Sequence, residues 1–244
     1  MGLASAIELA LIGARVTLIA RSENDLQAAL KLLDSSKGQK HDYLVADYSD
    51  LKAVERKIDA LLEKQGGFQI LVNNTGGPAG GPITNAQLNE FTSAFNNHLL
   101  LNHLLVQKLL PGMKSADYGR IINIISTSVK IPLNGLGVSN TIRGAVASWA
   151  KTMANELGAF GITVNNVLPG ATATDRLEAI INTKASKSNT AVDKVAEQMK
   201  AQVPLNRFAL PEEIGAFVAF LASPAAAYIN GTSTPVDGGR TGSI

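Results

Sequence analysis

Apolar and polar positions along the chain form two kinds of segment, and their alternation predicts a parallel α/β fold. Short continuous apolar runs such as RVTLIA and RIINIIS are typical of strands buried on both faces of a sheet. Between them, apolar residues recur at spacings of three and four, as in amphipathic helices. The runs predict strands at 15–20, 42–46, 68–72, 120–126, 162–168 and 232–236. The periodic segments predict helices at 3–12, 23–34, 50–65, 85–110, 138–158 and 211–222.

The pattern indicates a single domain with one insertion. No linker, repeat or low-complexity tract divides residues 1–244, so we expect one doubly wound parallel sheet covered by helices on both faces. Residues 175–205 interrupt the alternation of strand and helix patterns because they are polar, with a run of Lys, Ser and Asn at 184–189. Open α/β sheets place ligand-covering segments after the carboxyl end of a strand. We therefore expect a lid at 175–205, with a solvated surface excursion as the alternative.

Composition narrows the class of protein. Apolar residues make up 45% and charged residues 17%, which suffices for a buried core. The net charge of +2 is too small and too dispersed to suggest nucleic acid. The chain has no cysteine, which excludes disulfides, thiolate metal sites and a cysteine nucleophile, and fits a reducing compartment.

Neither a leader nor a membrane span is expected. The amino-terminal stretch carries Glu8 and lacks a basic leader or a cleavage pattern, so it does not read as a signal peptide. The longest uncharged run is broken at Ser223 and Pro224, and its apolar part is shorter than the ~20 residues of a spanning helix. We expect a soluble, cytoplasmic protein with no membrane partner.

Four short motifs occur in order, three of them directly after predicted strands and one at the last strand. They are N-N-T-G at 73–76, a strand ending in Ser126, P-G-A-T-A-T at 169–174 and P-V-D-G-G at 235–239. Together they resemble the short-chain dehydrogenase/reductase family over essentially the whole chain. The resemblance implies a Rossmann-like sheet, a dinucleotide cofactor and hydride transfer to or from a carbonyl/alcohol pair. Because a fold does not fix a function, the chemistry has to be inferred from the residues at the candidate site.

The beginning of the chain departs from the family pattern. The family opens with a strand and a T-G-x-x-x-G-x-G turn, whose glycines let the backbone approach the pyrophosphate. Aligned back from G-A-R-V at 13–16, Gly2 falls on the last glycine, so the first strand is missing. That strand is central in the family's sheet, and its loss leaves two apolar neighbours unpaired. Our hypothesis is that the natural protein begins upstream; finding Met1 as the first residue of protein isolated from its host would refute it.

The resemblance assigns further cofactor contacts. The second family strand ends in Arg21 with no carboxylate, which suits a 2′-phosphate and favours NADP, with NAD as the alternative. An arginine that merely ends a strand is the competing interpretation. Asp47 matches the family's adenine-contacting aspartate, while Asn73 and Gly76 match the adenosine side of the cleft. The P-G-A-T-A-T motif supplies the remaining cofactor candidates, Pro169, Gly170 and Thr174, the last near the nicotinamide or pyrophosphate.

The catalytic positions of the family are mostly substituted here. Counted back from 155–157, the Tyr-x-x-x-Lys pair falls on Ser139 and Arg143. Ser126, thirteen residues before Ser139, matches the catalytic serine. The family's structural asparagine falls on His98. An alkyl hydroxyl is too weak an acid to replace the phenol, whereas Arg143 can still bind ribose hydroxyls as a cation.

A replacement proton donor is therefore needed, and His98 is the best candidate because imidazole titrates near neutrality. A structural histidine is the competing interpretation, and Lys130 is a weaker candidate. A metal site at His98 and His103 is not expected, because a spacing of five turns them to different helix faces.

The leading hypothesis for the function is an NADP-dependent oxidoreductase that resembles a 3-oxoacyl reductase but lacks the family's tyrosine acid. In it, Ser126 polarises the carbonyl of a small-molecule substrate. The rival is a non-catalytic or regulatory nucleotide-binding homologue. A hydrolase lacks support because no G-x-S-x-G surrounds Ser126 or Ser139. The resemblance also implies a homodimer or homotetramer formed through helices 85–110 and 138–158 and the last strand.

Overall fold

The computed structural model describes residues 1–242. All six predicted strands form, and every pairing between them is parallel. The strands are β1 (Thr17–Ala20), β2 (Asp42–Val45), β3 (Ile70–Asn73), β4 (Gly119–Ile124), β5 (Ile162–Pro169) and β6 (Ser233–Val236). The helices are α1 (Gly2–Leu11), α2 (Glu23–Leu30), α3 (Leu51–Gln65), α4 (Leu88–Phe95), α5 (Leu101–Ser115), α6 (Gly137–Leu157), α7 (Asp175–Ser188), α8 (Val192–Lys200) and α9 (Pro211–Ala222). The α/β parallel-sheet prediction is confirmed.

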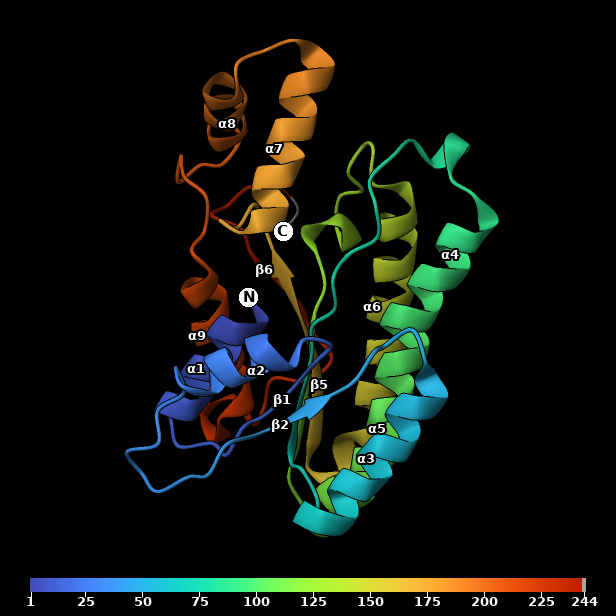
Figure 1. The fold of residues 1–244 in the computed structure, drawn as a ribbon, viewed down its shortest axis with the longest axis vertical. Coiled ribbons are helices and arrows are strands. Elements are labelled where there is room, and N and C mark those ends of the chain that lie inside the picture. Colours follow the sequence, from blue (N-terminus) through green and yellow to red (C-terminus); the bar gives the residue numbers. More distant parts are fainter. Residues whose placement is uncertain (243–244) are drawn as a thin grey trace.

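The sheet is split in two. Among residues 1–242, β1 pairs only with β2, and β3, β4, β5 and β6 form a separate four-stranded sheet in that order. Within residues 1–242 no strand lies between β1 and β3, which is where the sequence predicted a strand to be missing. Helices α1, α2 and α9 lie on one side of the strands and α3, α5 and α6 on the other (Figure 1). The two parts are therefore joined by side-chain packing instead of a backbone ladder.

Two apolar clusters form the core, one on each side of the strands. Val54, Val106 and Ile121 are completely buried in the cluster beneath α3, α5 and α6. Ile214 and Val218 are completely buried in the cluster beneath α1 and α9. Because helices cover both faces of the sheet, side chains on both sides of each strand are buried, which explains why the strands are continuously apolar.

The predicted helix at 85–110 is interrupted and longer than expected. α4 passes through a π-helical turn, η2 (Asn96–Leu100), into α5, which continues beyond Pro111 to Ser115. The sequence analysis placed the end of this helix at residue 110, just before Pro111, although proline within a helix removes one hydrogen bond. Burial of Leu109 and Met113 on the flanking turns accompanies the continuation. Single π-turns occur frequently at functional sites.

The polar stretch at 175–205 forms two helices, which the sequence analysis did not predict. Leu177, Ile181 and Ala185 make a buried stripe on α7 that packs against Val195 of α8. The stripe was overlooked because the segment as a whole is polar, with Lys, Ser and Asn concentrated at 182–189. Figure 1 shows α7 and α8 together at one end of the molecule, above β6. Within residues 1–242, no helix is both long and apolar enough to cross a bilayer.

A row of buried polar side chains crosses the four-stranded sheet. Asn73 Nδ2 donates to Asn123 Oδ1 at 2.8 Å, and Asn123 Nδ2 donates to Asn166 Oδ1 at 2.9 Å. Asn166 Nδ2 continues the row to Ser233 Oγ at 3.0 Å. These four residues, here called the amide ladder, are in register on neighbouring strands. The amide ladder ties the four strands together, and it crosses β3 and β4 near their carboxyl ends, β5 at its middle and β6 at its first residue.

Candidate active site and cofactor cleft

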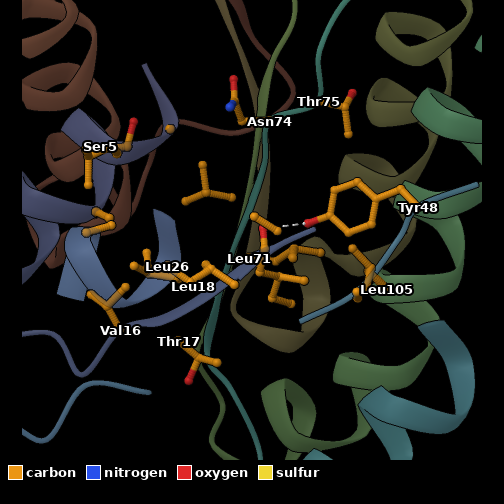
Figure 2. A pocket seen from close by; sticks show the side chains of 18 of the residues that line it. Ser5, Val16, Thr17, Leu18, Leu26, Tyr48, Leu71, Asn74, Thr75 and Leu105 are labelled. Carbon is orange, nitrogen blue, oxygen red and sulfur yellow. Dashed lines mark hydrogen bonds between the residues drawn. The ribbon is translucent and has the colours of Figure 1, made fainter. Parts of the chain in front are cut away.

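A cavity of about 760 Å³ runs between β1 and β3 along their length and reaches their carboxyl ends. Its rim includes the first turn of α1, the end of β1, and the loops that follow β2 and β3. In open parallel sheets, ligands bind in the crevice beyond the carboxyl ends of the strands. Figure 2 shows Asn74 and Thr75 at this rim, with Tyr48 reaching in from the loop after β2. The cavity is therefore in the position of a cofactor cleft.

Gly2 brings the start of α1 against the loop that follows β3. A Cβ atom at Gly2 would lie 2.6 Å from Asn74 Nδ2, closer than side chains tolerate. The free N–H groups at a helix start, together with the helix dipole, favour an anion at this point. Gly2 lines the cavity as predicted. Its lack of a side chain keeps backbone N–H groups accessible there.

Arg21 and Asp47 lie at the rim of the same cavity, and both are exposed. The Asp47 carboxylate accepts the Ser49 N–H at 2.9 Å and the Ser49 hydroxyl at 2.8 Å. These two hydrogen bonds lower the pKa of Asp47, and the nearby Arg21 charge lowers it further. The rim of the adenosine side thus carries one cation and one carboxylate that stays ionised.

Asn73 was predicted to line the cleft and does not. Its side chain is 5% exposed and donates to Asn123 within the amide ladder. Because successive strand residues face opposite sides, the neighbouring residues reach the cavity instead. Gly76 lines the cavity as predicted, and the residues missed by the sequence analysis are Asn74, Thr75, Ser5 and Tyr48. The sequence analysis ended this strand at residue 72, whereas β3 ends at Asn73. With the strand end placed at Asn73, the predicted cavity contact would have moved from Asn73 to Asn74.

Three predicted cofactor residues lie outside this cavity, beyond β5. Pro169 ends β5 beside Val236, and a Cβ at Gly170 would lie 2.7 Å from Asp237 Cβ. Thr174 caps α7, since its hydroxyl accepts the Leu177 N–H at 3.4 Å. These residues position the start of α7. Their contact with a cofactor stays a prediction.

Ser126 follows β4 and begins a short 3₁₀ turn, η3 (Thr127–Val129). Its Oγ accepts the Ser128 N–H at 3.1 Å, which leaves its own hydrogen free to donate. Ser139 lies in the first turn of α6 and is half-buried. Within the described chain, its side chain makes no hydrogen bond with Ser126. The two serines thus do not form a nucleophile–base pair.

Arg143 is buried, with 7% of its surface exposed. Its guanidinium donates to the Ile124 carbonyl at 3.1 Å and the Thr75 carbonyl at 3.4 Å, while Nε is buried without a partner. Desolvation, with a smaller effect of the Arg176 charge, lowers its pKa to about 10, so it remains a cation at neutral pH. Arg143 thus joins α6 to the ends of β3 and β4, and its contact with the ribose stays a prediction.

His98 is buried in the π-turn and contacts the Thr75 hydroxyl through Nδ1. Burial lowers its pKa to about 3, and the charges of Arg143 and Arg176 contribute. The expectation that this imidazole titrates near neutrality is therefore wrong, because water is excluded and the neighbouring charges are positive. Neutral His98 supports Thr75 at the cleft rim, and an imidazolium proton donor is not available at neutral pH.

Arg176 is a site residue that the sequence analysis missed. From the first turn of α7, it donates to the Gly77 carbonyl at 3.1 Å and the Pro78 carbonyl at 2.9 Å. Arg143 and Arg176 therefore hold one loop, 75–78, from two different helices. The loop after β3, which lines the cavity, is thereby tied to the predicted lid. The only feature of the sequence that could have indicated a role for Arg176 is its position shortly after the P-G-A-T-A-T motif.

Comparison with known proteins places this geometry in a family. A sequence profile described as enoyl-(acyl carrier protein) reductase matches residues 1–241. The chain belongs to the short-chain dehydrogenase/reductase family. The fold and the motif order predicted from sequence agree with this membership. The positions assigned to the family's Tyr and Lys, at Ser139 and Arg143, stay a prediction.

Relatives in the family are matched along nearly their whole length. The 3-oxoacyl-[acyl-carrier-protein] reductase FabG of Vibrio cholerae is 33% identical over 98% of this chain and 92% of its own. A monensin polyketide synthase putative ketoacyl reductase of Streptomyces virginiae is 31% identical over the same shares. Among solved structures, L-sorbose reductase from Gluconobacter frateurii, complexed with NADPH and L-sorbose, superimposes with a TM-score of 0.92. That match has 27% identity and covers 100% of this chain and 93% of the reductase.

Proposed function

We propose that the protein is an NADPH-dependent reductase that converts a carbonyl group to an alcohol. The observation that carries the proposal is Arg21, a cation at the end of β1, at the rim of a cavity whose other wall is the start of α1. A 2′-phosphate suits a cation at this strand end, whereas the ribose hydroxyls of NAD favour a carboxylate. The NADPH-bound reductase from Gluconobacter frateurii supports the choice of cofactor.

The residues present fit the adenosine half of this cofactor. Gly2 lies where a side chain would collide with Asn74, so the start of α1 offers backbone N–H groups to a pyrophosphate. Asp47, held ionised by Ser49, accepts from the adenine amino group. When bound, NADPH supplies the hydride.

On the substrate side, Ser126 donates a hydrogen bond to the carbonyl oxygen. Its Oγ already accepts the Ser128 N–H, so its own hydrogen is free to point at the substrate. The buried Arg143 cation keeps loop 75–78 against β4 and adds positive potential beside the developing alkoxide. Because His98 stays neutral with a pKa of about 3, we propose that water delivers the proton.

The proposed substrate class is a 3-oxoacyl compound or a related ketone. The named activities of the Vibrio cholerae and Streptomyces virginiae relatives support it, since both are reductases of ketoacyl groups. The lid segment would close over such a substrate, with Arg176 joining it to the cofactor loop. Closure of this kind excludes water from a reacting carbonyl.

Cofactor binding is tested by calorimetric titration of NADPH and then NADH. We expect NADPH to bind more tightly, and Arg21→Ala to weaken NADPH about tenfold at low salt while leaving NADH unchanged. Arg56→Ala, an exposed change on α3, is the matched control. Equal loss for both cofactors in Arg21→Ala would contradict the assignment of Arg21 to the 2′-phosphate.

Turnover is tested by following NADPH oxidation with a 3-oxobutanoyl thioester, a cyclic diketone and a ketose. Ser126→Ala should lower kcat by about 10²–10³ with little change in NADPH affinity, because it removes a donor used in the transition state. Ser128→Ala is the control, since its backbone N–H still reaches Ser126. Full activity in Ser126→Ala would remove this residue from the mechanism.

A second candidate is a non-catalytic nucleotide-binding homologue. It is favoured by the lack of a group that titrates near neutrality among Ser126, Ser139, Arg143 and His98. It predicts NADPH binding with no turnover of any carbonyl in the panel. The titration and the turnover assay together therefore separate the two candidates.

We also propose a homo-oligomer formed through α4, α5 and α6. Leu88 is 86% exposed on α4, and Phe95 and Leu100 are each 39% exposed at the π-turn. Exposed apolar side chains grouped on one helix are typical of an interface. Light scattering coupled to gel filtration gives the mass directly, and Leu88→Lys should reduce it to that of one chain.

A further inference from the structure

A second cavity lies at the amino ends of β4 and β5, at the opposite end of the sheet from Ser126. Its volume is about 610 Å³, and its walls are the starts of the two strands, the turns that precede them and the segment that follows α9. We propose that this cavity binds a small organic monocarboxylate with an aromatic body, held by Arg120. The site is independent of the proposed reductase activity.

Arg120 is a buried cation without a counter-ion. It is 3% exposed, and within residues 1–242 it forms no ion pair. Its Nη1 donates to the carbonyls of Gly119 and Gly161 at 2.8 and 3.2 Å. The guanidinium carbon lies 4.0 Å from the centroid of the Tyr118 ring. These contacts offset part of the cost of burying a cation but leave its charge without an opposite charge.

One edge of this guanidinium is free to bind an anion. Nε is buried without a partner, and Nη2 makes no hydrogen bond within the described chain. Together these two nitrogens form an edge that can donate two parallel hydrogen bonds to the oxygens of a carboxylate. Because Arg120 lines the cavity, a carboxylate bound there would satisfy this edge and neutralise the buried charge.

Thr163 adds a hydroxyl beside Arg120. The two residues are register partners on β5 and β4, so their side chains lie side by side on one face of the sheet. Thr163 is 6% exposed, lines the cavity, and makes no side-chain hydrogen bond within residues 1–242. Asn230 also lines the cavity but has no free group of this kind, since its amide accepts from the Val164 N–H and donates to the Ala154 carbonyl. Arg120 and Thr163 are therefore the two donors that a ligand can use.

The other walls of the cavity are aromatic and apolar. The Tyr118 hydroxyl donates to the Ala222 carbonyl at 2.6 Å, which fixes the ring against the end of α9. Pro224 and Ala227 line the cavity beyond it, and the side chain of Tyr228 is fully exposed at its rim. An aromatic ring attached to the carboxylate would pack between these walls and cover exposed aromatic surface.

Asp117 limits the charge of the ligand. It is exposed at the cavity rim and forms no ion pair with Arg120. Its negative charge repels a ligand more strongly when the ligand carries two charges than when it carries one. A single guanidinium beside a rim carboxylate therefore favours a monocarboxylate over a doubly charged phosphate.

The test uses the full chain with phenylacetate as the probe, measured by calorimetry and by heteronuclear NMR of the arginine side chains. Binding should move the Nε–H resonance of Arg120 downfield, because a hydrogen bond to a carboxylate forms there. Nε of Arg143 is also buried without a partner, and its resonance is the internal control that should not move. Phenylacetamide and inorganic phosphate should each bind at least about tenfold more weakly than phenylacetate.

Substitutions at three positions test the residues separately. Thr163→Val removes the hydroxyl at nearly constant shape and should weaken phenylacetate binding at least about fivefold, whereas Thr163→Ser keeps the hydroxyl and should bind normally. Asp117→Asn removes the repulsion and should tighten binding about twofold at low salt. Asparagine tolerates the φ of +48° found at this position. Arg120→Lys keeps the charge without the two-pronged edge and should weaken binding at least about tenfold.

The opposite results overturn the proposal. No binding of phenylacetate, or binding without a shift of the Arg120 Nε–H resonance, shows that Arg120 does not hold a carboxylate. Equal affinity for phenylacetamide shows a general apolar cavity, and equal affinity for phosphate shows an unselective anion site. Unchanged affinity in Thr163→Val and Arg120→Lys places the ligand elsewhere. None of these results depends on NADPH or on turnover, so failure here is distinguishable from failure of the proposed reductase function.

Discussion

Asn123 is the middle member of the amide ladder, and its replacement gives the sharpest prediction about stability. Its side chain is completely buried, accepts from Asn73 and donates to Asn166. Asn123→Val leaves Asn73 Nδ2 and Asn166 Oδ1 buried without partners, each at a cost of about 1–3 kcal/mol. Valine recovers about 1 kcal/mol through apolar burial and strand preference. We expect a net loss of about 3 kcal/mol, or about 6–12 °C in Tm.

A double variant at Asn73 and Asn123 should lose no more stability than the single variant at Asn123. Asn73→Val combined with Asn123→Val removes the orphaned Asn73 amide, including the oxygen that lacks a partner in the native structure. The double variant should therefore be at least as stable as Asn123→Val alone. Urea unfolding, followed by circular dichroism, measures both, with exposed Asn24→Val as a control expected within about 0.5 kcal/mol. If the losses of unfolding free energy in Asn73→Val and Asn123→Val simply add in the double variant, the hydrogen-bond explanation of the ladder is refuted.

Three further predictions follow from single contacts. The unfolded pKa of His98 is 6.5 and the folded pKa is about 3, so the unfolded chain binds more protons in this window and stability falls as pH decreases through it. Between pH 6.5 and 5 the loss should be about 2 kcal/mol, and urea unfolding of His98→Gln should not show it. Arg176→Ala frees the loop after β3 from α7, so NADPH should dissociate several-fold faster in stopped-flow measurements, whereas Lys184→Ala should not change the rate. Gly2→Val displaces Asn74, so calorimetry should show NADPH binding at least about tenfold weaker, with Tm nearly unchanged. Normal NADPH affinity in that variant would show that the start of α1 does not contact the cofactor.

The periodic pattern predicted the strands and most helices because each carries a continuous or regularly spaced apolar set. The split of the sheet was expected from the family resemblance instead, which places a central strand before Gly2. The helices at 175–200 were missed because their buried stripe is narrow. The continuation of α5 through Pro111 depends on tertiary packing that outweighs a local helix breaker.

The candidate site was predicted less completely than the fold. Gly2, Arg21, Asp47 and Gly76 line one cavity, and their contacts with a cofactor stay predictions. The sequence showed which residue types occur at the family positions. Their pKa values and hydrogen-bond partners, however, depend on how deeply the folded chain buries them. Arg143 and His98 differ most from expectation, because water exclusion and mutual positive charge depend on the packing of α6 against the π-turn. No spacing rule reveals such desolvation.

The split sheet has a consequence for how cofactor affinity is determined. Arg21 and Asp47 belong to the part of the chain that contains β1 and β2, and in the described chain no backbone ladder joins this part to the other strands. Such a part can open by itself at a free energy below that of global unfolding. The measured affinity for a dinucleotide is then the intrinsic affinity multiplied by the fraction of molecules in which this part is closed. Low urea concentrations should consequently weaken NADPH binding while the remainder of the molecule stays folded.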